Sequence, residues 1–335
     1  MPTRTVSASS GCVIKPVYPG APAARSHGRP AGRARGRPGA VGYDVRVIDD
    51  RLVLSDPRFA RPGTGGGISG VIKQHYLLSL LLKRGVTTRY FGSALGWIWS
   101  YVRPTAQFFM YYVVIGLLFG RTRGMENFGV YLFAGIVVAN LFSEILRTTT
   151  GSVLSNRALV QKIYLPREIF PIAAVGNSLV HFLPQLAVLF VVSLFFGWHF
   201  DIAKSFVFIV GLLIMILFTL GLGLLFASLN VIYRDTKNVV DILLMFSTWA
   251  SPILYTFEMV QDHAPPWLFH FYMSNPVTVA VEMSHVSFWD VTTATATQPE
   301  HLWWYALVAF VISCIVLVVG QSVFRKLEGD FAQNL

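Results

Sequence analysis

FVFIVGLLIMILFTLGLGLLFASLNVIY, residues 206–233, contains no Asp, Glu, Lys or Arg. A run of this length exceeds the roughly 20 apolar residues that a helix needs to cross a bilayer. The whole chain has the same character, because 54% of its 335 residues are hydrophobic and only 13% are charged. Soluble domains carry about 25% charged residues. The sequence therefore predicts an all-α, polytopic membrane protein.

Five further apolar runs have the length or composition of membrane spans. They cover residues 104–120, 128–146, 169–198, 239–257 and 302–324. The first can begin several residues earlier if Arg103 reaches the interface, and Pro184 marks the place for a kink in the third. With residues 206–233 they make six transmembrane helices. An even number of spans places both termini on the same side.

The distribution of Lys and Arg predicts the orientation of these spans. Basic residues occur in the connections 147–167 and 234–237 and again after residue 324. Between residues 238 and 324 there is no Lys or Arg, whereas five acidic residues occur from residue 258 to residue 300. Because cytoplasmic loops are enriched in Lys and Arg, we expect both termini in the cytoplasm and residues 258–300 outside a plasma membrane. Arg121 and Arg123 disagree with this topology, since it places them outside.

Residues 1–70 differ from the rest in composition. They hold 11 of the 27 Lys and Arg residues, set among Gly, Pro and Ala. Such a segment cannot bury enough apolar surface to offset its chain entropy, so we expect a flexible basic cytoplasmic tail. The Arg residues are not interleaved with aromatic ones, which argues against nucleic-acid binding. Residues 71–335 form the expected six-span domain.

Two apolar stretches do not have the pattern of ordinary spans. Residues 72–90 mix leucines with Lys and Arg, and predict an interfacial helix along the inner face of the membrane. Residues 265–289 are interrupted by Asn275-Pro276, which leaves two runs too short to span. They predict a re-entrant helical hairpin or interfacial helices that form a lid or rim on the outer side.

The sequence carries no catalytic or metal-binding pattern. Zinc-protease and nucleophile-elbow motifs are absent, and the glycine-rich stretch 63–70 lacks the Lys-Ser/Thr of a phosphate loop. We therefore expect no catalytic residues, no metal and no cofactor in this chain. His263, His270 and His285 are interpreted as polar residues near the interface. Glu144 with Arg147, and Lys237 with Asp241, have the spacing to pair along one helix and fix helix ends.

Several motifs, in order, resemble those of the permease subunits of polysaccharide ATP-binding-cassette exporters of the Wzm type. They are Gly96-Trp-Ile-Trp99 with Arg103-Pro104, Lys162-Ile-Tyr-Leu-Pro166 with Ile169-Phe-Pro171, Tyr233-Arg-Asp235, and Ser251-Pro-Ile-Leu-Tyr255. The resemblance covers about residues 70–330. This family exports O-antigen, teichoic acid and galactan. The Gly, Ala and Arg bias of the tail resembles actinobacterial proteins and suggests the mycobacterial galactan exporters within the family.

The resemblance implies a homodimer that works with two copies of a separate ATPase subunit, which would bind ATP and Mg²⁺. It makes residues 156–166 a coupling helix, a role that the spacing alone leaves even with a solvated turn. Residues 72–90 become the interface helix and 265–289 a pair of gate helices. The residues expected to couple to the ATPase are Asn156, Arg157, Gln161, Lys162, Tyr164, Pro166, Arg234 and Asp235.

A lipid-linked polysaccharide needs a wet channel, because its hydroxyls would otherwise lose their hydrogen bonds with water. Aromatic side chains offer surfaces to sugar rings. The candidate channel residues are Trp97, Trp99, Arg103, Phe108, Tyr111, Tyr112, Trp249 and Tyr255. Arg103 could meet a pyrophosphate linker. Alternatives are a permease of the same fold for a drug or small lipid, a membrane glycosyltransferase using Asp49 and Asp50, and a passive channel.

Overall fold

The structure is a computed structural model that describes residues 70–71, 74–89, 92–94, 96–120, 125–162, 165–294, 296–329 and 331. These residues form helices, turns and loops, and no β-strand occurs among them. All of them belong to one compact unit, Pro62–Leu335. The predicted tail, apart from Gly70, lies outside the described residues, as do Arg121 and Arg123.

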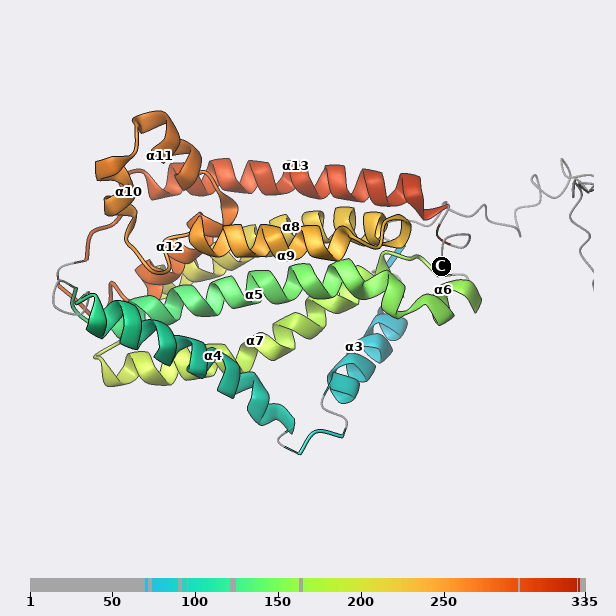
Figure 1. Cartoon of the computed structure of the whole chain (residues 1–335), viewed down its shortest axis with the longest axis horizontal. Helices are drawn as coiled ribbons and strands as arrows, with labels where there is room; N and C mark the ends of the chain where they lie inside the picture. The colour runs from blue at the N-terminus through green and yellow to red at the C-terminus, as the bar shows by residue number, and fades with distance from the viewer. Residues whose placement is uncertain are drawn as a thin grey trace, which may run out of the picture. The chain divides into compact units, whose positions relative to one another are not determined.

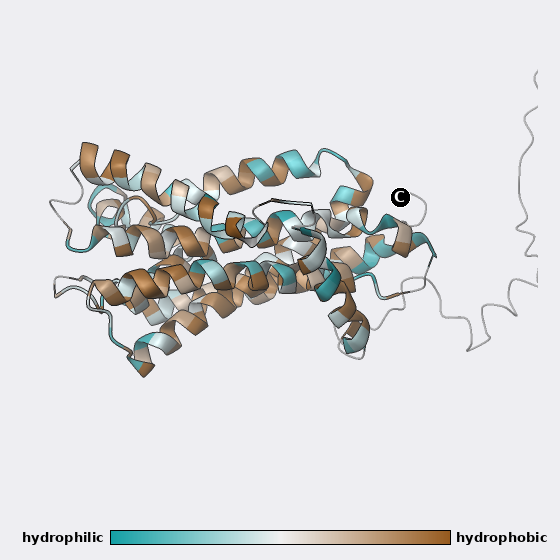
Figure 2. Ribbon diagram, turned by 90° about the horizontal axis from the view of Figure 1, so that it is seen from below, coloured by the Kyte–Doolittle hydropathy of each residue, from teal (hydrophilic) through white to brown (hydrophobic). Residues whose placement is uncertain are grey.

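Four helices of the described part are long and apolar enough to cross a membrane. They are α5 (Phe128–Ser155), α7 (Ile169–Phe195), α8 (Ile202–Ile232) and α13 (Leu302–Glu328). Each matches a predicted apolar run, and Figure 1 shows them lying side by side along the bundle. Apolar residues cover much of their length, as the brown colour in Figure 2 shows. The prediction of an all-helical, multi-span architecture is confirmed at this level.

Helix α5 extends well beyond the predicted end at residue 146. Thr149 and Thr150 donate hydrogen bonds from their hydroxyls to the carbonyls of Ile145 and Leu146, so polar side chains continue the helix without open donors. The helix ends at Ser155, where Asn156 takes the capping position. Glu144 therefore lies inside α5 rather than near its end. The short helix α6 (Arg157–Lys162) follows directly.

The first predicted span consists of three consecutive types of helix. A 3₁₀ turn, η1 (Gly96–Ile98), leads into α4 (Trp99–Tyr111), which continues as the π-helix η2 (Tyr112–Leu118). Pro104 is buried in the first part of α4. The helical run thus begins upstream of Arg103, as the sequence allowed.

The fifth predicted run, residues 239–257, is not one helix. Helix α9 (Thr236–Trp249) ends early, and a buried non-helical segment from Ser251 to Leu254 follows. Pro252 explains the break, because a proline disfavours the α conformation of the residue before it. At about 1.5 Å per residue, the 14 residues of α9 reach only about two-thirds of a hydrocarbon core.

The predicted hairpin contains two helices, as expected. After α10 (Phe257–His263) come α11 (Pro266–Met273) and α12 (Pro276–Phe288). The Asn275 side chain caps α12 by accepting a hydrogen bond from the Val277 amide at 3.1 Å. Every residue of α12 is buried, and α12 packs against α5 and α8. Helix α12 is therefore part of the core, and the lid or rim on the outer side stays a prediction.

Helix α3 (His75–Arg89) lies within the predicted range 72–90 and packs against α7. Two glycines permit this contact. A Cβ at Gly85 would lie 2.1 Å from Asn177 Nδ2, and a Cβ at Gly176 would lie 2.6 Å from Leu82 Cδ2. In Figure 1, α3 is inclined to the long helices.

Helices α8 and α13 cross at an equally close contact. A Cβ built on Gly320 would lie 2.1 Å from the carbonyl oxygen of Gly221. Because the obstacle is backbone, no rotamer change could relieve it. Small residues at a crossing allow helices to pack closely in a membrane, where close packing replaces the hydrophobic drive of water.

Candidate functional site: a basic cavity at one end of the bundle

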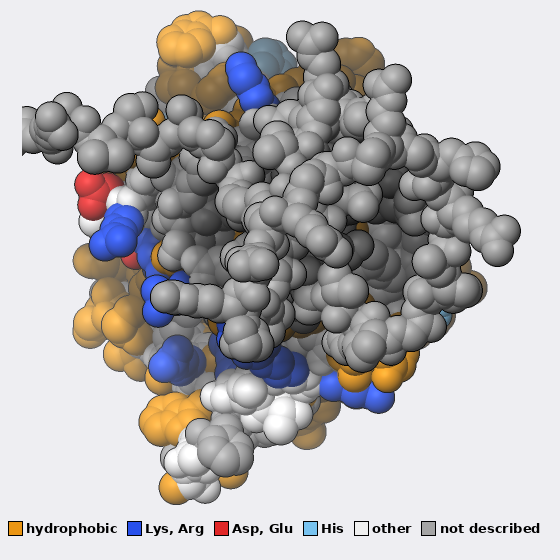
Figure 3. All heavy atoms as spheres, turned by 90° about the vertical axis from the view of Figure 1, so that its right-hand side faces the viewer, with side chains coloured by type: hydrophobic (Ala, Val, Ile, Leu, Met, Phe, Trp, Pro, Cys, Tyr) orange, Lys and Arg blue, Asp and Glu red, His pale blue; other side chains and the backbone are white. Residues whose placement is uncertain are grey.

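The two ends of the bundle differ in charge. One end, called here the basic end, contains α6 and the C-terminal end of α13, and Figure 3 shows Lys and Arg side chains on it. Its described basic residues are Arg157, Lys162, Arg167, Arg234, Arg325 and Lys326. The opposite end, called the acidic end, contains α10 and α11 (Figure 1). Its described acidic residues include Glu126, Glu258, Asp262, Asp290 and Glu300.

The predicted coupling segment lies at the basic end. Within the range 156–166, residues 157–162 form the helix α6. Val160 is buried in an apolar cluster, whereas Arg157, Gln161 and Lys162 are exposed. One face of α6 thus anchors the helix and the other is open to a partner.

The other residues of the coupling set vary in their surroundings. Asn156 donates from Nδ2 to the carbonyl of Ser152 at 2.8 Å, and Pro166 is half-buried. Arg234 and Asp235 are exposed in the turn between α8 and α9, at the same end. Tyr164 lies outside the described residues.

The predicted channel residues lie in two regions, the η1–α4–η2 run and the end of α9 with the segment after it, and α4, η2 and α9 all pack against α5. On α4 and η2, Phe108 and Tyr112 are half-buried and stack with ring centroids 5.5 Å apart. Tyr111 is also half-buried, whereas Trp99 and Arg103 are exposed. Trp97 lies in η1, and its side chain is outside the described part.

The remaining two channel candidates lie at the end of α9. Trp249 is 63% exposed, and Tyr255 donates its hydroxyl to the Trp249 carbonyl at 2.6 Å. The structure therefore links Trp249, the last residue of α9, with Tyr255 in the non-helical segment that follows, and neither belongs to the α4–η2 run.

A cavity of about 660 Å³ lies among α3, α5, α7 and α9. Sequence analysis did not identify it. Its charged lining residues are Arg84, Arg89, Arg147, Lys237 and Asp241. Its polar lining residues include Thr88, Thr148, Thr150, Ser152, Ser155, Asn156, Asn177, Ser178 and His181. This set is strongly polar for a cavity between apolar helices.

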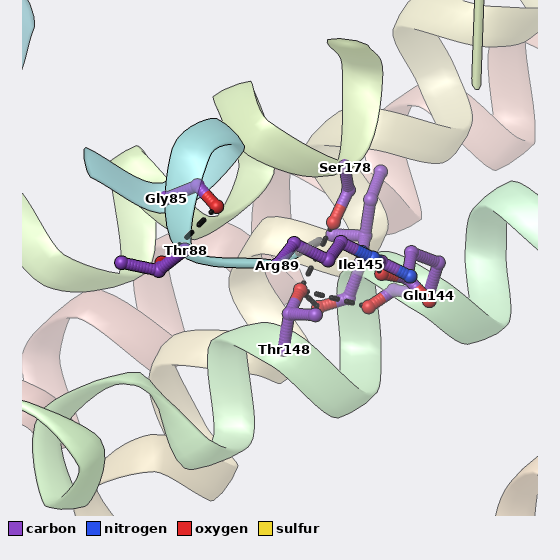
Figure 4. A network of polar contacts seen from close by, with 7 residues as sticks. All are labelled: Gly85, Thr88, Arg89, Glu144, Ile145, Thr148 and Ser178. Atoms are coloured by element: carbon purple, nitrogen blue, oxygen red, sulfur yellow. Dashed lines mark hydrogen bonds and ion pairs between the residues drawn. The ribbon is translucent and has the colours of Figure 1, made fainter. Parts of the chain in front are cut away.

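Ion pairs across helices form part of its wall (Figure 4). Arg89 of α3 pairs with Glu144 of α5, which joins the N-terminal helix to the bundle. Beside this pair, the hydroxyls of Thr148 and Ser178 are 3.0 Å apart. The predicted pairs within single helices are therefore replaced by contacts between helices.

The second carboxylate shows the same behaviour. Arg147 Nε donates to Asp241 Oδ1 at 3.0 Å, so α5 is joined to α9. Lys237 is not bonded to Asp241 at ion-pair distance, although it lies one turn away. Lys237 and Asp241 both line the cavity, and Arg147 takes the position beside the Asp241 carboxylate.

The electrostatics of the cavity favour an anionic ligand. Four cationic side chains line it and only one carboxylate does so directly. Within the described residues, no carboxylate lies at ion-pair distance from Arg84 or Lys237. The buried Asn177 Oδ1 also accepts no hydrogen bond there. Guanidinium and ammonium groups are the usual protein partners of phosphate.

No group of three or more His, Cys, Asp or Glu side chains in the described part could hold a metal ion. His263, His270 and His285 do not form such a group. His270 Nδ1 is 2.8 Å from the Tyr305 hydroxyl, and His285 is buried against Tyr131.

Comparison with known proteins identifies the family. Residues 76–289 match the family model described as ABC-2 type transporter. The chain is 27% identical over 263 residues to the O-antigen export system permease protein RfbA of Myxococcus xanthus, covering 77% of this chain and 95% of that protein.

Two further relatives have similar coverage. The O-antigen export system permease protein RfbA of Klebsiella pneumoniae is 26% identical over 261 residues, which is 77% of this chain and 95% of the relative. The polysialic acid transport protein KpsM of Escherichia coli is 23% identical over 264 residues, which cover 78% of this chain and 96% of that protein. The family match spans the helices that build the cavity, α6 and the hairpin, and the chain belongs to the ABC-2 type transporter family.

Proposed function

We propose that this chain is the permease subunit of an ATP-driven exporter that moves a lipid-linked polysaccharide from the cytoplasm across the plasma membrane. The observation that carries the proposal is the match to polysaccharide and O-antigen export permeases over about 95% of their length. A match of this extent includes the helices around the basic cavity. Galactan is the polymer that the tail composition suggests, and it is the first substrate to test.

The proposed topology has six spans and both termini in the cytoplasm. The spans are the α4–η2 run, α5, α7, α8, α9 with the segment that follows it, and α13. Concentration of Lys and Arg at the basic end supports a cytoplasmic position for that end. Helix α3 then lies along the inner interface, and the α11–α12 pair enters from the outer side. The buried position of α12 favours a re-entrant arrangement.

The proposed partner at the basic end is an ATPase subunit that binds ATP and Mg²⁺. Two copies would act on a homodimer of this chain. The exposed face of α6, with Arg157, Gln161 and Lys162, supplies a short rigid element of the kind that fits a groove on a soluble protein. The exposed Arg234-Asp235 turn lies at the same end and extends that surface.

The basic cavity has a role in this scheme as the site for the anionic linker of the substrate. A phosphate or pyrophosphate group could be held by Arg84, Arg147 and Lys237, with hydroxyls and amides completing its hydrogen bonds. The polymer itself would follow a wet path past aromatic rings of α4 and α9. Arg103, the residue first expected to meet the linker, is exposed and is not part of the cavity lining.

Depletion of the protein in its host tests the function. We expect full-length lipid-linked glycan to accumulate on the cytoplasmic side, because synthesis continues while export stops. Truncated glycan would instead indicate an enzyme of synthesis. An unchanged glycan pool would indicate another exported substrate, such as a drug or small lipid. Complementation with Lys162→Glu, compared with Lys326→Glu, tests whether α6 rather than basic charge in general is required.

A further inference from the structure

A second, smaller cavity lies at the acidic end, away from the basic cavity. Its volume is about 220 Å³, and it is bounded by α5, the start of α10, α12 and the loop that follows α12. Glu282, His285 and Asp290 form its buried part. Thr297, which is exposed, and Glu258, which is half-buried, lie at its opening and are hydrogen-bonded to each other.

Two buried side chains in this cavity have unused hydrogen-bonding atoms. Glu282 is 3% exposed and its Oε1 accepts no hydrogen bond; His285 is 1% exposed and neither ring nitrogen has a partner. His285 Nδ1 lies 3.7 Å from Glu282 Oε1, which is too long for a hydrogen bond. Buried polar groups are normally hydrogen-bonded, because leaving a buried donor or acceptor without a partner is costly. A ligand that fills the cavity would remove this cost.

The surroundings hold His285 in place before any ligand arrives. Its ring stacks on Tyr131 with centroids 3.8 Å apart, and the Tyr131 hydroxyl is fixed by the carbonyls of Pro252 and Tyr255. One turn further along α5, the backbone approaches closely at Gly135, where a Cβ would lie 3.2 Å from His285 Nε2. A site with fixed side chains loses little entropy when it binds.

The lining determines the class of ligand. No Lys or Arg lines the cavity, and three carboxylates do, so an anion is excluded. A hydroxyl group can donate to Glu282 and accept from His285 at the same time. Phe257 and Trp289 add aromatic walls of the kind that contact sugar rings. The volume is below the roughly 300–1,000 Å³ of sites for drug-sized ligands, which favours one ring over an oligosaccharide.

We propose that this outer cavity binds a single neutral sugar unit through hydrogen bonds to Glu282 and His285. The inference rests on the proposed function, since the exported polymer would supply the unit at the outer end of its path. The buried Glu282 and His285 side chains give the site its preference for a hydroxyl-bearing ligand. A free sugar outside the cell offers the same chemistry.

Saturation-transfer NMR on the permease–ATPase complex in lipid nanodiscs tests binding directly, with D-galactose as the probe. We expect transfer to D-galactose in the wild type and at least about tenfold weaker binding in Glu282→Gln, because a charge-assisted hydrogen bond is replaced by a neutral one. Glu300→Gln is the matched control, since Glu300 is exposed on the loop that follows α12 and does not line the cavity. It should bind as the wild type does.

Thr297→Val covers the case in which Glu282→Gln does not fold. This change is confined to the opening and should weaken binding severalfold. Absence of transfer in the wild type, or equal transfer in wild type and variants, would overturn the proposal. Transfer to ethanolamine but not to D-galactose would also overturn it in favour of an amine site.

Competition by a galactan oligosaccharide distinguishes the two sources of sugar. If the terminal unit of the oligosaccharide displaces D-galactose, the exported polymer is supported as the ligand. If the oligosaccharide does not compete, the polymer is rejected as the source of the sugar. The glycan-depletion experiment is independent, because it reads export rather than binding. Accumulated glycan without D-galactose binding would reject the outer site alone, whereas binding with an unchanged glycan pool would reject the proposed function.

Discussion

Arg147 of α5 and Asp241 of α9 form a 3.0 Å contact at the wall of the basic cavity. Both side chains are more than half exposed, so the pair adds less than about 1 kcal/mol to stability. Its importance lies in the charge of the cavity. The Asp241 carboxylate is paired with the Arg147 guanidinium, which would otherwise be free to bind an anionic ligand.

Substitutions of the two partners should therefore change anion binding in opposite directions. Asp241→Asn frees Arg147 and should tighten binding of inorganic pyrophosphate, whereas Arg147→Gln should weaken it, each by up to about fivefold. Calorimetric titration of the nanodisc complex measures both. Arg234→Gln, which removes an exposed cation outside the cavity, should bind as the wild type does. Changes in the same direction would contradict the assignment.

The crossing of α8 and α13 should tolerate no side chain. Gly320→Ala places a Cβ 2.1 Å from the Gly221 carbonyl oxygen, and the helices must separate. We expect a loss of about 1–3 kcal/mol in the free energy of unfolding, as for other overpacked contacts. Thermal unfolding of the purified protein measures this loss. Gly329→Ala is the control, since no atom lies within 4 Å of a Cβ there, and an equal loss in both would refute the crossing.

Asp290 should make stability depend on pH. Burial raises the pKa of its carboxyl above the ordinary value of 3.8, although the hydrogen bond from Gln298 Nε2 at 2.6 Å acts in the other direction. The folded state therefore holds the proton more tightly than the unfolded chain. Stability should fall as pH rises from 3.8 through the raised value, and then become level.

Asp290→Asn should remove this fall and increase stability at neutral pH. Unfolding temperatures measured across the acidic range test the prediction. The Glu300→Gln variant should retain the wild-type profile, because Glu300 is exposed. A pH profile that is the same with and without Asp290 would show that its carboxyl makes no contribution.

Trp249 offers the best single test of an aromatic path. It is 63% exposed, so Trp249→Ala should slow glycan export severalfold while leaving the unfolding temperature nearly unchanged. Trp304 has the same 63% exposure on α13 and serves as the matched control, with export expected at the wild-type rate. Tyr112→Ala should also slow export, but its ring stacks on Phe108 and Phe128, so stability must be measured beside it.

The long helices could be predicted from sequence because their signal is local. Apolar runs of sufficient length place α5, α7, α8 and α13 within a few residues of their observed starts. The early end of α9 also has a local signal in the sequence, because Pro252 disfavours a helical conformation of the residue before it. The continuation of α5 past residue 146 was not predicted because the apolar run ends there, although the hydroxyl side chains that follow can bond to their own helix.

The basic cavity could not be predicted in the same way. Its members lie on four helices, and no segment contains enough of them to form a motif. A weak signal was present in Asn177, Ser178 and His181, which interrupt an otherwise apolar run. The partners of Glu144 and Asp241 show the same limit: sequence spacing gives the neighbour on the same helix, whereas packing brings Arg89 and Arg147 instead.

The π-helix η2 gives α4 a way to turn about its own axis. A π-helix closes its hydrogen bonds one residue further along the chain than an α-helix does. Tightening η2 to an α-helix would therefore rotate all of α4 relative to α5, without any tilt of the helix. Because Phe108, Tyr111 and Tyr112 project at different angles, each winding state would present a different aromatic ring to α5.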